Sequence, residues 1–229
     1  NIERCMSKLI LMRHGQASFG SDRYDCLSGL GGLQARAAGQ WMMERDIRPT
    51  ALVHGPRQRQ IETACILKEQ GGFQTPMLQH VELDEFAEGE EIFKAAELYL
   101  GRSMHEAGDR SRLDVLRDYD ETCNAWSLGE IKIEGRLSID EFRGQVRQWF
   151  NNLIHQPDIA GQLVIAVTSA GVISALVCEV LDLPNVKWHS LLRVIGNASL
   201  TELLFSKGRY SLSSFNGLGH LPRELNSSM

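Results

Sequence analysis

Leu9-Ile10-Leu11-Met12-Arg13-His14-Gly15-Gln16 is the stretch that decides the fold: an apolar run that stops at an arginine, a histidine and a glycine. A short apolar run of this kind is typical of a buried strand in an α/β sheet. In such sheets ligands bind beyond the carboxyl ends of the strands, where Arg13, His14 and Gly15 would lie. The stretch therefore predicts chemistry at this edge of a sheet.

The three residues that follow the apolar run suit phosphate chemistry. A neutral imidazole such as His14 is a good nucleophile at neutral pH, and the guanidinium of Arg13 can hold a phosphate through two parallel hydrogen bonds. Gly15 lets the backbone approach an anion closely. Alone, however, the tripeptide also fits a histidine with a structural role.

A second motif follows the next apolar run, Ala51-Leu52-Val53. It reads Gly55-Pro56-Arg57-Gln58-Arg59-Gln60-Ile61-Glu62-Thr63-Ala64. Arg-His-Gly after one strand and Pro-x-x-Arg-x-x-x-Thr-Ala after the next resemble, in order and spacing, the histidine phosphatase superfamily, also called the phosphoglycerate mutase-like family. Shorter similarities at 27–35, 83–85 and 216–221 extend this resemblance from about Lys8 to Leu221.

The resemblance implies a three-layer α/β/α fold with a mostly parallel central sheet, in a single domain over residues 1–229. In this family an insertion after the third strand commonly forms a helical cap over the pocket, and residues 89–135 would be that insertion. Because such a cap sets substrate choice, its basic residues are candidates for substrate contacts, although each alone is more typical of surface charge. They are Arg102, His105, Arg110, Arg112 and Arg117.

Catalytic roles also follow from the resemblance. His14 would accept the phosphoryl group, and Arg13 and Arg59 would hold its oxygens. Glu85, kept protonated by burial, would supply the proton that the leaving group needs. Its acidic neighbours remain alternatives for that role: Asp84, Glu88, Glu90 and Glu91.

The predicted phosphate-binding set is wider than the catalytic one. Its members are Arg13, Gly15, Gln16, Arg59, Ser169 and Ala170. A helix beginning near Arg57 would add backbone N–H groups. The resemblance implies no cofactor, and the sequence has no cluster of His, Asp or Glu at metal-ligand spacing, so no metal is expected.

Residue 169 departs from the family pattern. The family usually has a second active-site histidine in Thr/Ser-His-Gly-Gly-Val, and the matching run here is Val167-Thr168-Ser169-Ala170-Gly171-Val172. A serine hydroxyl carries no charge, and removing one transition-state donor typically slows turnover by about 10²–10³. The sequence thus predicts weak turnover or none, and an increase in turnover for Ser169→His. His54 is a candidate replacement for the missing imidazole.

Three functions stay open on this basis. The first is a metal-independent phosphatase that acts on a small phosphorylated substrate through a phosphohistidine. The second is an impaired pseudophosphatase that binds a phosphorylated ligand or partner. The third is a mutase, which is disfavoured because family mutases typically show Arg-His-Gly-x-Ser-x-x-Asn, whereas Ala17 and Gly20 stand at the serine and asparagine positions.

Composition narrows the class of protein. A chain of 229 residues with 43% hydrophobic and 23% charged residues can form one globular core. The net charge of −5 disfavours a nucleic-acid partner, and no apolar run reaches the length of about 18 residues that a membrane helix needs. The scattered cysteines favour a reducing cytoplasm over disulfides or a zinc site: Cys5, Cys26, Cys65, Cys123 and Cys178. The oligomeric state is not predicted.

Periodicity and capping signals predict the elements between the motifs. Strands are expected at 9–12, 51–54, 76–83, 163–167, 199–205 and 210–215, the last two joined by a turn at Lys207-Gly208. Helices are expected at 30–42, 57–68, 90–106, 112–126, 139–155 and 171–181. Arg57 is interpreted as a solvated charge. Gln34, Ala35, Asn197, Asn216 and His220 are interpreted as structural.

Overall fold

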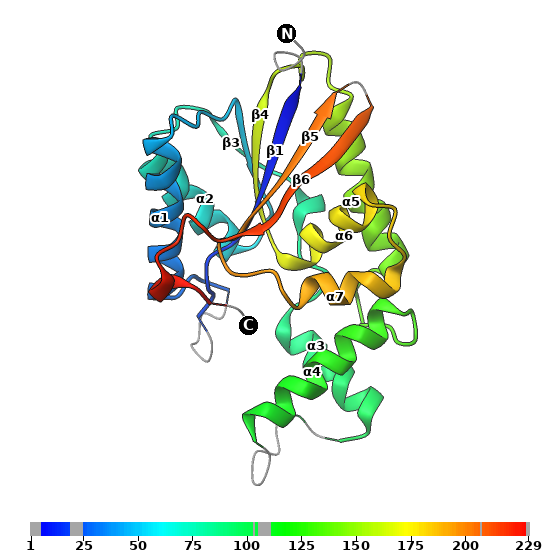
Figure 1. Ribbon diagram of the computed structural model, residues 1–229. Helices are drawn as coiled ribbons and strands as arrows, with labels where there is room; N and C mark the ends of the chain where they lie inside the picture. Colours follow the sequence, from blue (N-terminus) through cyan, green and yellow to red (C-terminus); the bar gives the residue numbers. More distant parts are fainter. Residues whose placement is uncertain (1–5, 19–24, 103, 105–110, 207, 228–229) are drawn as a thin grey trace.

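A computed structural model (Figure 1) describes residues 6–18, 25–102, 104, 111–206 and 208–227. The predictions for Cys5, Gly20, His105, Arg110 and Lys207 lie outside the described residues.

The described strands form one mixed sheet in the order β3-β2-β4-β1-β5-β6. Their bounds are β1 (Ser7–Arg13), β2 (Ala51–His54), β3 (Met77–Gln79), β4 (Leu163–Thr168), β5 (Leu200–Ser206) and β6 (Arg209–Gly217). β1 to β4 are mutually parallel, whereas β5 is antiparallel to both of its neighbours. The predicted mostly parallel sheet is confirmed.

Helices cover both faces of the sheet (Figure 1). Their bounds are α1 (Gly29–Glu44), α2 (Gln58–Gly71), α3 (Gly89–Leu100), α4 (Arg112–Ser127), α5 (Ile139–Ile154), α6 (Ala170–Val180) and α7 (Trp188–Leu192). In Figure 1, α1 and α2 lie on one side of the strands and α5 and α6 on the other, which is the predicted three-layer arrangement.

Alternation along β1 explains why the sheet is covered on both sides. Leu9 and Leu11 belong to the apolar cluster that includes α5 and α6, whereas Ile10 and Met12 belong to the cluster that includes α1 and α2. All four side chains are buried. Because successive side chains of a strand point to opposite faces, a continuous apolar run produces a strand buried twice.

Two predicted helix starts are confirmed by their caps. The Ser28 hydroxyl accepts a hydrogen bond from the backbone N–H of Gly31 (3.1 Å) at the start of α1. Ser138 and Glu141 form the expected capping box before α5, each side chain bonding the other's backbone N–H.

Two elements are shorter than predicted. The strand expected over 76–83 is limited to β3, because the chain turns into a 3₁₀ helix at Val81–Leu83. The helix expected over 90–106 ends at Leu100, where Gly101 adopts a left-handed conformation (φ 65°) and closes α3. The short helix α7 has no clear sequence signal and was not predicted.

Pairing between β1 and β4 brings the key segments together. Arg13 lies opposite Thr168, and the backbone N–H of His14 donates to the Thr168 carbonyl (2.9 Å). His14 and Ser169 therefore leave the sheet at the same edge. Helices α3 and α4, from the segment predicted to be a cap, lie beyond this edge in Figure 1.

Candidate active site

His14 lies directly after β1 and is held by a hydrogen bond at each ring nitrogen. Its Nδ1 is 2.7 Å from the Gly15 carbonyl oxygen, and Arg59 Nε donates to its Nε2 (3.2 Å). A carbonyl can only accept and a guanidinium can only donate. The contacts therefore place the proton on Nδ1 and leave the lone pair on Nε2.

The surroundings of His14 keep its imidazole neutral. Burial lowers its pKa well below the ordinary value, and the positive charges of Arg59 and Arg13 lower it further. A neutral imidazole with its lone pair on Nε2 has the electronic state that a nucleophile requires at neutral pH.

Arg13 ends β1 beside His14 and is 6% exposed. Its Nη1 donates to the Ile195 carbonyl, while its Nε has no hydrogen-bond partner in the described part of the chain. Burial lowers the pKa of Arg13 to about 10, so the side chain stays charged at neutral pH. A buried N–H of a charged group without a partner is costly, and an anionic ligand would satisfy it.

Arg59 lies in the first turn of α2 and faces the same imidazole. Its Nη1 is paired with Asp25 Oδ1 (2.6 Å) and with Glu88 Oε1 (3.2 Å). Burial disfavours its charge, but the carboxylates of Glu88 and Asp25 outweigh this effect and raise its pKa. A phosphate held by Arg59 would have to compete with these carboxylates.

Glu85 contributes a carboxyl group next to the start of α6. Its Oε1 accepts from the Phe86 N–H (3.0 Å) and its Oε2 from the Gly171 N–H (3.4 Å). Loss of solvation raises the pKa of Glu85 in spite of these hydrogen bonds and of the nearby positive charges of Arg59 and Arg13. The group can therefore hold a proton closer to neutral pH than a free glutamate.

A family model decides which group of proteins this site belongs to. The model described as histidine phosphatase superfamily (branch 1) matches residues 9–217, nearly the whole chain. The chain belongs to the histidine phosphatase superfamily. A comparison with curated protein sequences returned no match.

Solved structures of a phosphatase, a phosphoglycerate mutase and other proteins share the fold. A mycobacterial glucosyl-3-phosphoglycerate phosphatase is 23% identical, with 93% of this chain and 99% of the other covered and a TM-score of 0.64; it has also been solved with inorganic phosphate and with VO3. YhfR of Bacillus stearothermophilus is 17% identical (93% and 98% covered, TM-score 0.68). A phosphoglycerate mutase from Bacillus anthracis is 16% identical (96% and 97% covered, TM-score 0.67). At these identities the likeness shows the fold.

Arg57 corrects a sequence-based interpretation. It was expected to be a solvated charge because it lies two residues from Arg59. Its side chain is instead only 15% exposed and pairs with the carboxylates of Asp84 and Glu88. The pairing follows from the position of Arg57 at the N-cap of α2, which faces the acidic stretch after Leu83.

Three of the four acidic alternatives to Glu85 form ion pairs with arginines. Asp84 pairs with Arg57, Glu88 with Arg57 and Arg59, and Glu91 with Arg136 (2.8 Å). Glu90 is exposed on α3. Glu85 is thus the acidic residue of this stretch that combines a raised pKa with a position next to Arg13 and Arg59.

Gly15 and Gln16 have backbone N–H groups that are already bonded inside the protein. The Gly15 N–H donates to Thr63 Oγ1 (3.1 Å), and the Gln16 N–H donates to Gln34 Oε1 (2.8 Å). A Cβ at Gly15 would lie 2.4 Å from the Gly31 carbonyl oxygen, so no side chain fits there. The predicted role of Gly15 and Gln16 in phosphate binding therefore gains no support from free backbone N–H groups.

Ser169 is hydrogen-bonded to Gln60, a residue that the sequence analysis does not single out. Gln60 Nε2 donates to Ser169 Oγ (2.8 Å) and also to the Leu83 carbonyl (3.1 Å), and both side chains are fully buried. The neighbouring Gly55 makes this possible, because a Cβ there would lie 2.2 Å from Gln60 Oε1. Gln60 therefore fills space beside the position where the family usually has its second histidine. Ala170 follows as the first residue of α6.

His54 is the last residue of β2, and its described hydrogen bond does not place its ring in the role of the missing imidazole. Its Nδ1 is 2.8 Å from the Gly55 carbonyl oxygen. Among the described residues it forms no hydrogen bond with His14, Arg13 or Arg59. The replacement hypothesis therefore gains no support from the geometry.

The residues interpreted as structural make contacts of that kind. The Gln34 amide donates to Leu225 O (2.7 Å), the Asn216 amide accepts from Gly196 N (2.8 Å), and His220 bonds Ala198 O (3.0 Å). Asn197 Nδ2 lies 3.5 Å from the His14 carbonyl and so supports the backbone at His14. Ala35 is fully buried in α1.

Two features are absent from the part of the chain that the structure describes. The described residues contain no group of three or more His, Cys, Asp or Glu side chains placed to hold a metal ion. None of the helices in those parts of the chain has the length and apolar character needed to cross a membrane.

Gly171→Ala tests the position of Glu85. A Cβ at residue 171 would lie 2.0 Å from Glu85 Oε1, so the carboxyl group must move. If Glu85 is the proton donor that the resemblance implies, the leaving group then loses its aligned donor, and we expect kcat for an aryl phosphate to fall by about tenfold or more. Gly32→Ala in α1 is the matched control, since a Cβ there meets nothing within 4 Å. Equal rates for the two variants would contradict the placement of Glu85.

Proposed function

We propose that this protein is a metal-independent phosphatase that hydrolyses a small phosphate monoester through a phosphohistidine on His14. The observation that carries the proposal is the arrangement around His14: its Nε2 accepts from Arg59 Nε, and it lies within electrostatic range of the buried Arg13 guanidinium, whose Nε has no partner among the described residues. A phosphoryl group placed there would meet a nucleophile and two guanidinium groups at once.

The first step transfers the phosphoryl group to the enzyme. Arg59 Nε–H shifts its hydrogen bond from His14 Nε2 to a phosphoryl oxygen, which frees the Nε2 lone pair. His14 Nε2 then attacks phosphorus while the bond from phosphorus to the ester oxygen breaks. Glu85 gives its proton to that oxygen, so the leaving group departs as an alcohol. Arg13 and Arg59 balance the charge on the phosphoryl oxygens, which weakens the contacts of Arg59 with Asp25 and Glu88.

The second step releases phosphate. The ionised Glu85 carboxylate takes a proton from water, the water oxygen attacks phosphorus, and the bond from phosphorus to Nε2 breaks. The products are inorganic phosphate, neutral His14 and protonated Glu85, which is the starting state.

Phosphate release from 4-nitrophenyl phosphate in the presence of a chelator tests the proposal; a complete dependence on added metal would contradict it.

The pH dependence of kcat/KM follows from the two shifted groups. Glu85 must be protonated, and because its pKa is raised, activity persists toward neutral pH and falls as the pH rises through that value. His14 must be neutral, and because its pKa is lowered, activity on the acid side falls only below the ordinary titration range of imidazole. In Glu85→Gln the fall on the alkaline side should disappear together with most of the rate. An unchanged alkaline limb would show that another group is the acid.

Asp25→Asn should strengthen phosphate binding. Asp25 Oδ1 holds Arg59 Nη1 and its Oδ2 accepts from the Gln58 N–H (2.9 Å); asparagine keeps an acceptor for Gln58 and removes the charge. Because phosphate then meets less competition at Arg59, we expect its inhibition constant to fall by about fivefold. Asp46→Asn, which removes an exposed carboxylate beside Arg48, is the control. A weaker inhibition in Asp25→Asn would mean that Asp25 supports the binding of phosphate.

A binding protein is the second candidate, and the bond between Ser169 and Gln60 favours it. Because the Ser169 hydroxyl is fully buried, the site has no second imidazole and no exposed hydroxyl at that position. If wild type and His14→Ala are equally inert toward aryl phosphates while Arg59→Ala abolishes phosphate binding, this alternative replaces the phosphatase.

Location in a reducing cytoplasm stays a prediction from the sequence.

A further inference from the structure

The basic residues of the 89–135 segment differ in what they already contact. Arg102 is paired with Asp118 (Nε to Oδ2, 3.0 Å), and Arg117 Nη1 lies 3.7 Å from Asp114 Oδ1. His105 and Arg110 lie outside the described residues. Arg112 is exposed and forms no ion pair with any described residue. Of the cationic side chains that the structure describes in this segment's α4, Arg112 therefore has its charge available for a ligand.

Arg112 belongs to a row along one face of α4. Residues 112, 116, 119 and 123 are spaced by four, three and four positions, which places them one above another on an α-helix. Cys123 is buried in the core, and Tyr119 packs against it with its ring 5.7 Å from Phe93. Leu116 is 41% exposed. The row thus begins in the core and continues outward through Leu116 to Arg112.

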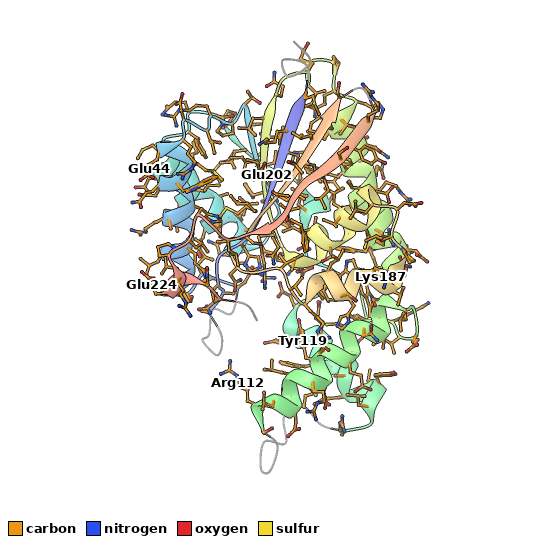
Figure 2. All side chains as sticks on the ribbon, in the orientation of Figure 1. Glu44, Arg112, Tyr119, Lys187, Glu202 and Glu224 are labelled. Atoms are coloured by element: carbon orange, nitrogen blue, oxygen red, sulfur yellow. The ribbon has the colours of Figure 1, made fainter. Side chains whose placement is uncertain are left out.

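The inner end of this row lies at the active site. The Tyr119 phenol is within electrostatic range of the Arg13 guanidinium. The Cys123 thiol is likewise within electrostatic range of the Glu85 carboxyl group. Figure 2 shows Tyr119 at the part of α4 near α7 and Arg112 at the other end of the helix. A molecule that extends from the phosphate site along α4 would therefore pass Tyr119 first and reach Arg112 last.

Contacts with α7 fix the direction of the row. Asp120 Oδ1 accepts a hydrogen bond from His189 Nε2 (3.0 Å) and forms an ion pair with Arg193 (Nε to Oδ1, 3.1 Å). The chain then continues to Ile195, whose carbonyl holds Arg13. The base of α4 is thus tied to the same segment that positions the phosphate-binding arginine.

We propose that Tyr119, Leu116 and Arg112 bind the leaving group of the substrate, which is an elongated phosphate monoester with an apolar segment and an anionic group at its far end. The inference rests on the proposed phosphatase function. Seven helical positions separate Tyr119 from Arg112, so the anion lies about 10 Å further along α4 than the contact with the aromatic ring. The apolar segment lies against Tyr119 and Leu116, and a carboxylate or a second phosphate pairs with Arg112.

Two matched aryl phosphates test this assignment: biphenyl-4-yl phosphate and 4′-carboxybiphenyl-4-yl phosphate. Wild type should have a higher kcat/KM for the carboxylated ester. Arg112→Gln should remove this preference, a loss of about threefold to fivefold. Arg117→Gln, which changes the same residue type about 140° around the same helix, should keep the wild-type ratio. Leu116→Asn should lower kcat/KM for both esters relative to Arg117→Gln.

The outcomes separate this inference from the proposed function. If wild type hydrolyses 4-nitrophenyl phosphate in a His14-dependent way but shows no preference for the carboxylated biphenyl ester, the leaving-group site is wrong and the phosphatase stands. An equal loss of preference in Arg112→Gln and Arg117→Gln overturns the assignment in the same way. If no aryl phosphate is hydrolysed, the phosphatase proposal fails and this inference fails with it.

Discussion

His14→Ala should reduce the hydrolysis of 4-nitrophenyl phosphate by about 10⁴-fold or more. The variant removes the only protein atom that the proposed mechanism bonds to phosphorus, and the described contacts offer no second nucleophile with the same two partners. Arg13 and Arg59 remain charged, so inorganic phosphate should still bind. Steady-state rates and the inhibition constant of phosphate, measured on the same preparation, separate the loss of chemistry from the loss of the site.

His54→Ala provides a close structural control for that experiment. His54 ends a buried strand, whereas His14 follows one; both are 6% exposed and place Nδ1 against the carbonyl of the next glycine. It has no recorded contact with the arginines of the site. We expect its loss to lower the melting temperature and to leave turnover near the wild-type rate at temperatures where both proteins are folded. Equal losses of activity in His14→Ala and His54→Ala would contradict the assignment of the nucleophile.

Ser169→His alone should lower turnover, and adding Gln60→Ala to it should raise turnover again. From sequence alone, Ser169→His was expected to raise turnover by restoring an imidazole. The structure argues against this expectation, because the fully buried Gln60 amide lies 2.8 Å from Ser169 Oγ and a larger ring at residue 169 would have to displace it. The single variant should therefore lose stability and activity, since an overpacked core shifts its neighbours.

Removing Gln60 at the same time should make room for the new imidazole. The double variant then gains a transition-state donor, and we expect its turnover to exceed that of Ser169→His by about 10²-fold. Gln60→Ala alone is the control, since it removes the amide and adds no donor. If the double variant is no faster than Gln60→Ala, the site does not use an imidazole at position 169, and the role of that position must be different.

The architecture could be predicted because its signals are local. The apolar run before Arg13 and the run 163–167 are buried on both faces, which is why they read as strands without any knowledge of their neighbours. The caps at Ser28 and Ser138 are equally local. By contrast, the early end of α3 depends on one left-handed glycine, Gly101, within a segment that otherwise continues a helical pattern.

The site could be predicted only in part, because the rest of it depends on long-range contacts. Motifs single out His14, Arg13, Arg59 and Glu85. In the structure Arg59 donates to His14, and Glu85 lies within electrostatic range of Arg59 and Arg13. The contact between Gln60 and Ser169 joins residues 109 positions apart, and nothing in the local sequence of Gln60 indicates it. The pairing of Arg57 with Asp84 was missed for the same reason.

The phosphohistidine is the most direct test of the proposed mechanism. Wild-type protein is mixed with an aryl phosphate, quenched within one turnover under alkaline conditions that preserve phosphohistidine, digested and analysed by mass spectrometry. The mechanism predicts one phosphoryl group on the peptide that contains His14, formed and lost at rates that match turnover. Sustained hydrolysis with no label on that peptide, or with the label on another residue, would contradict it.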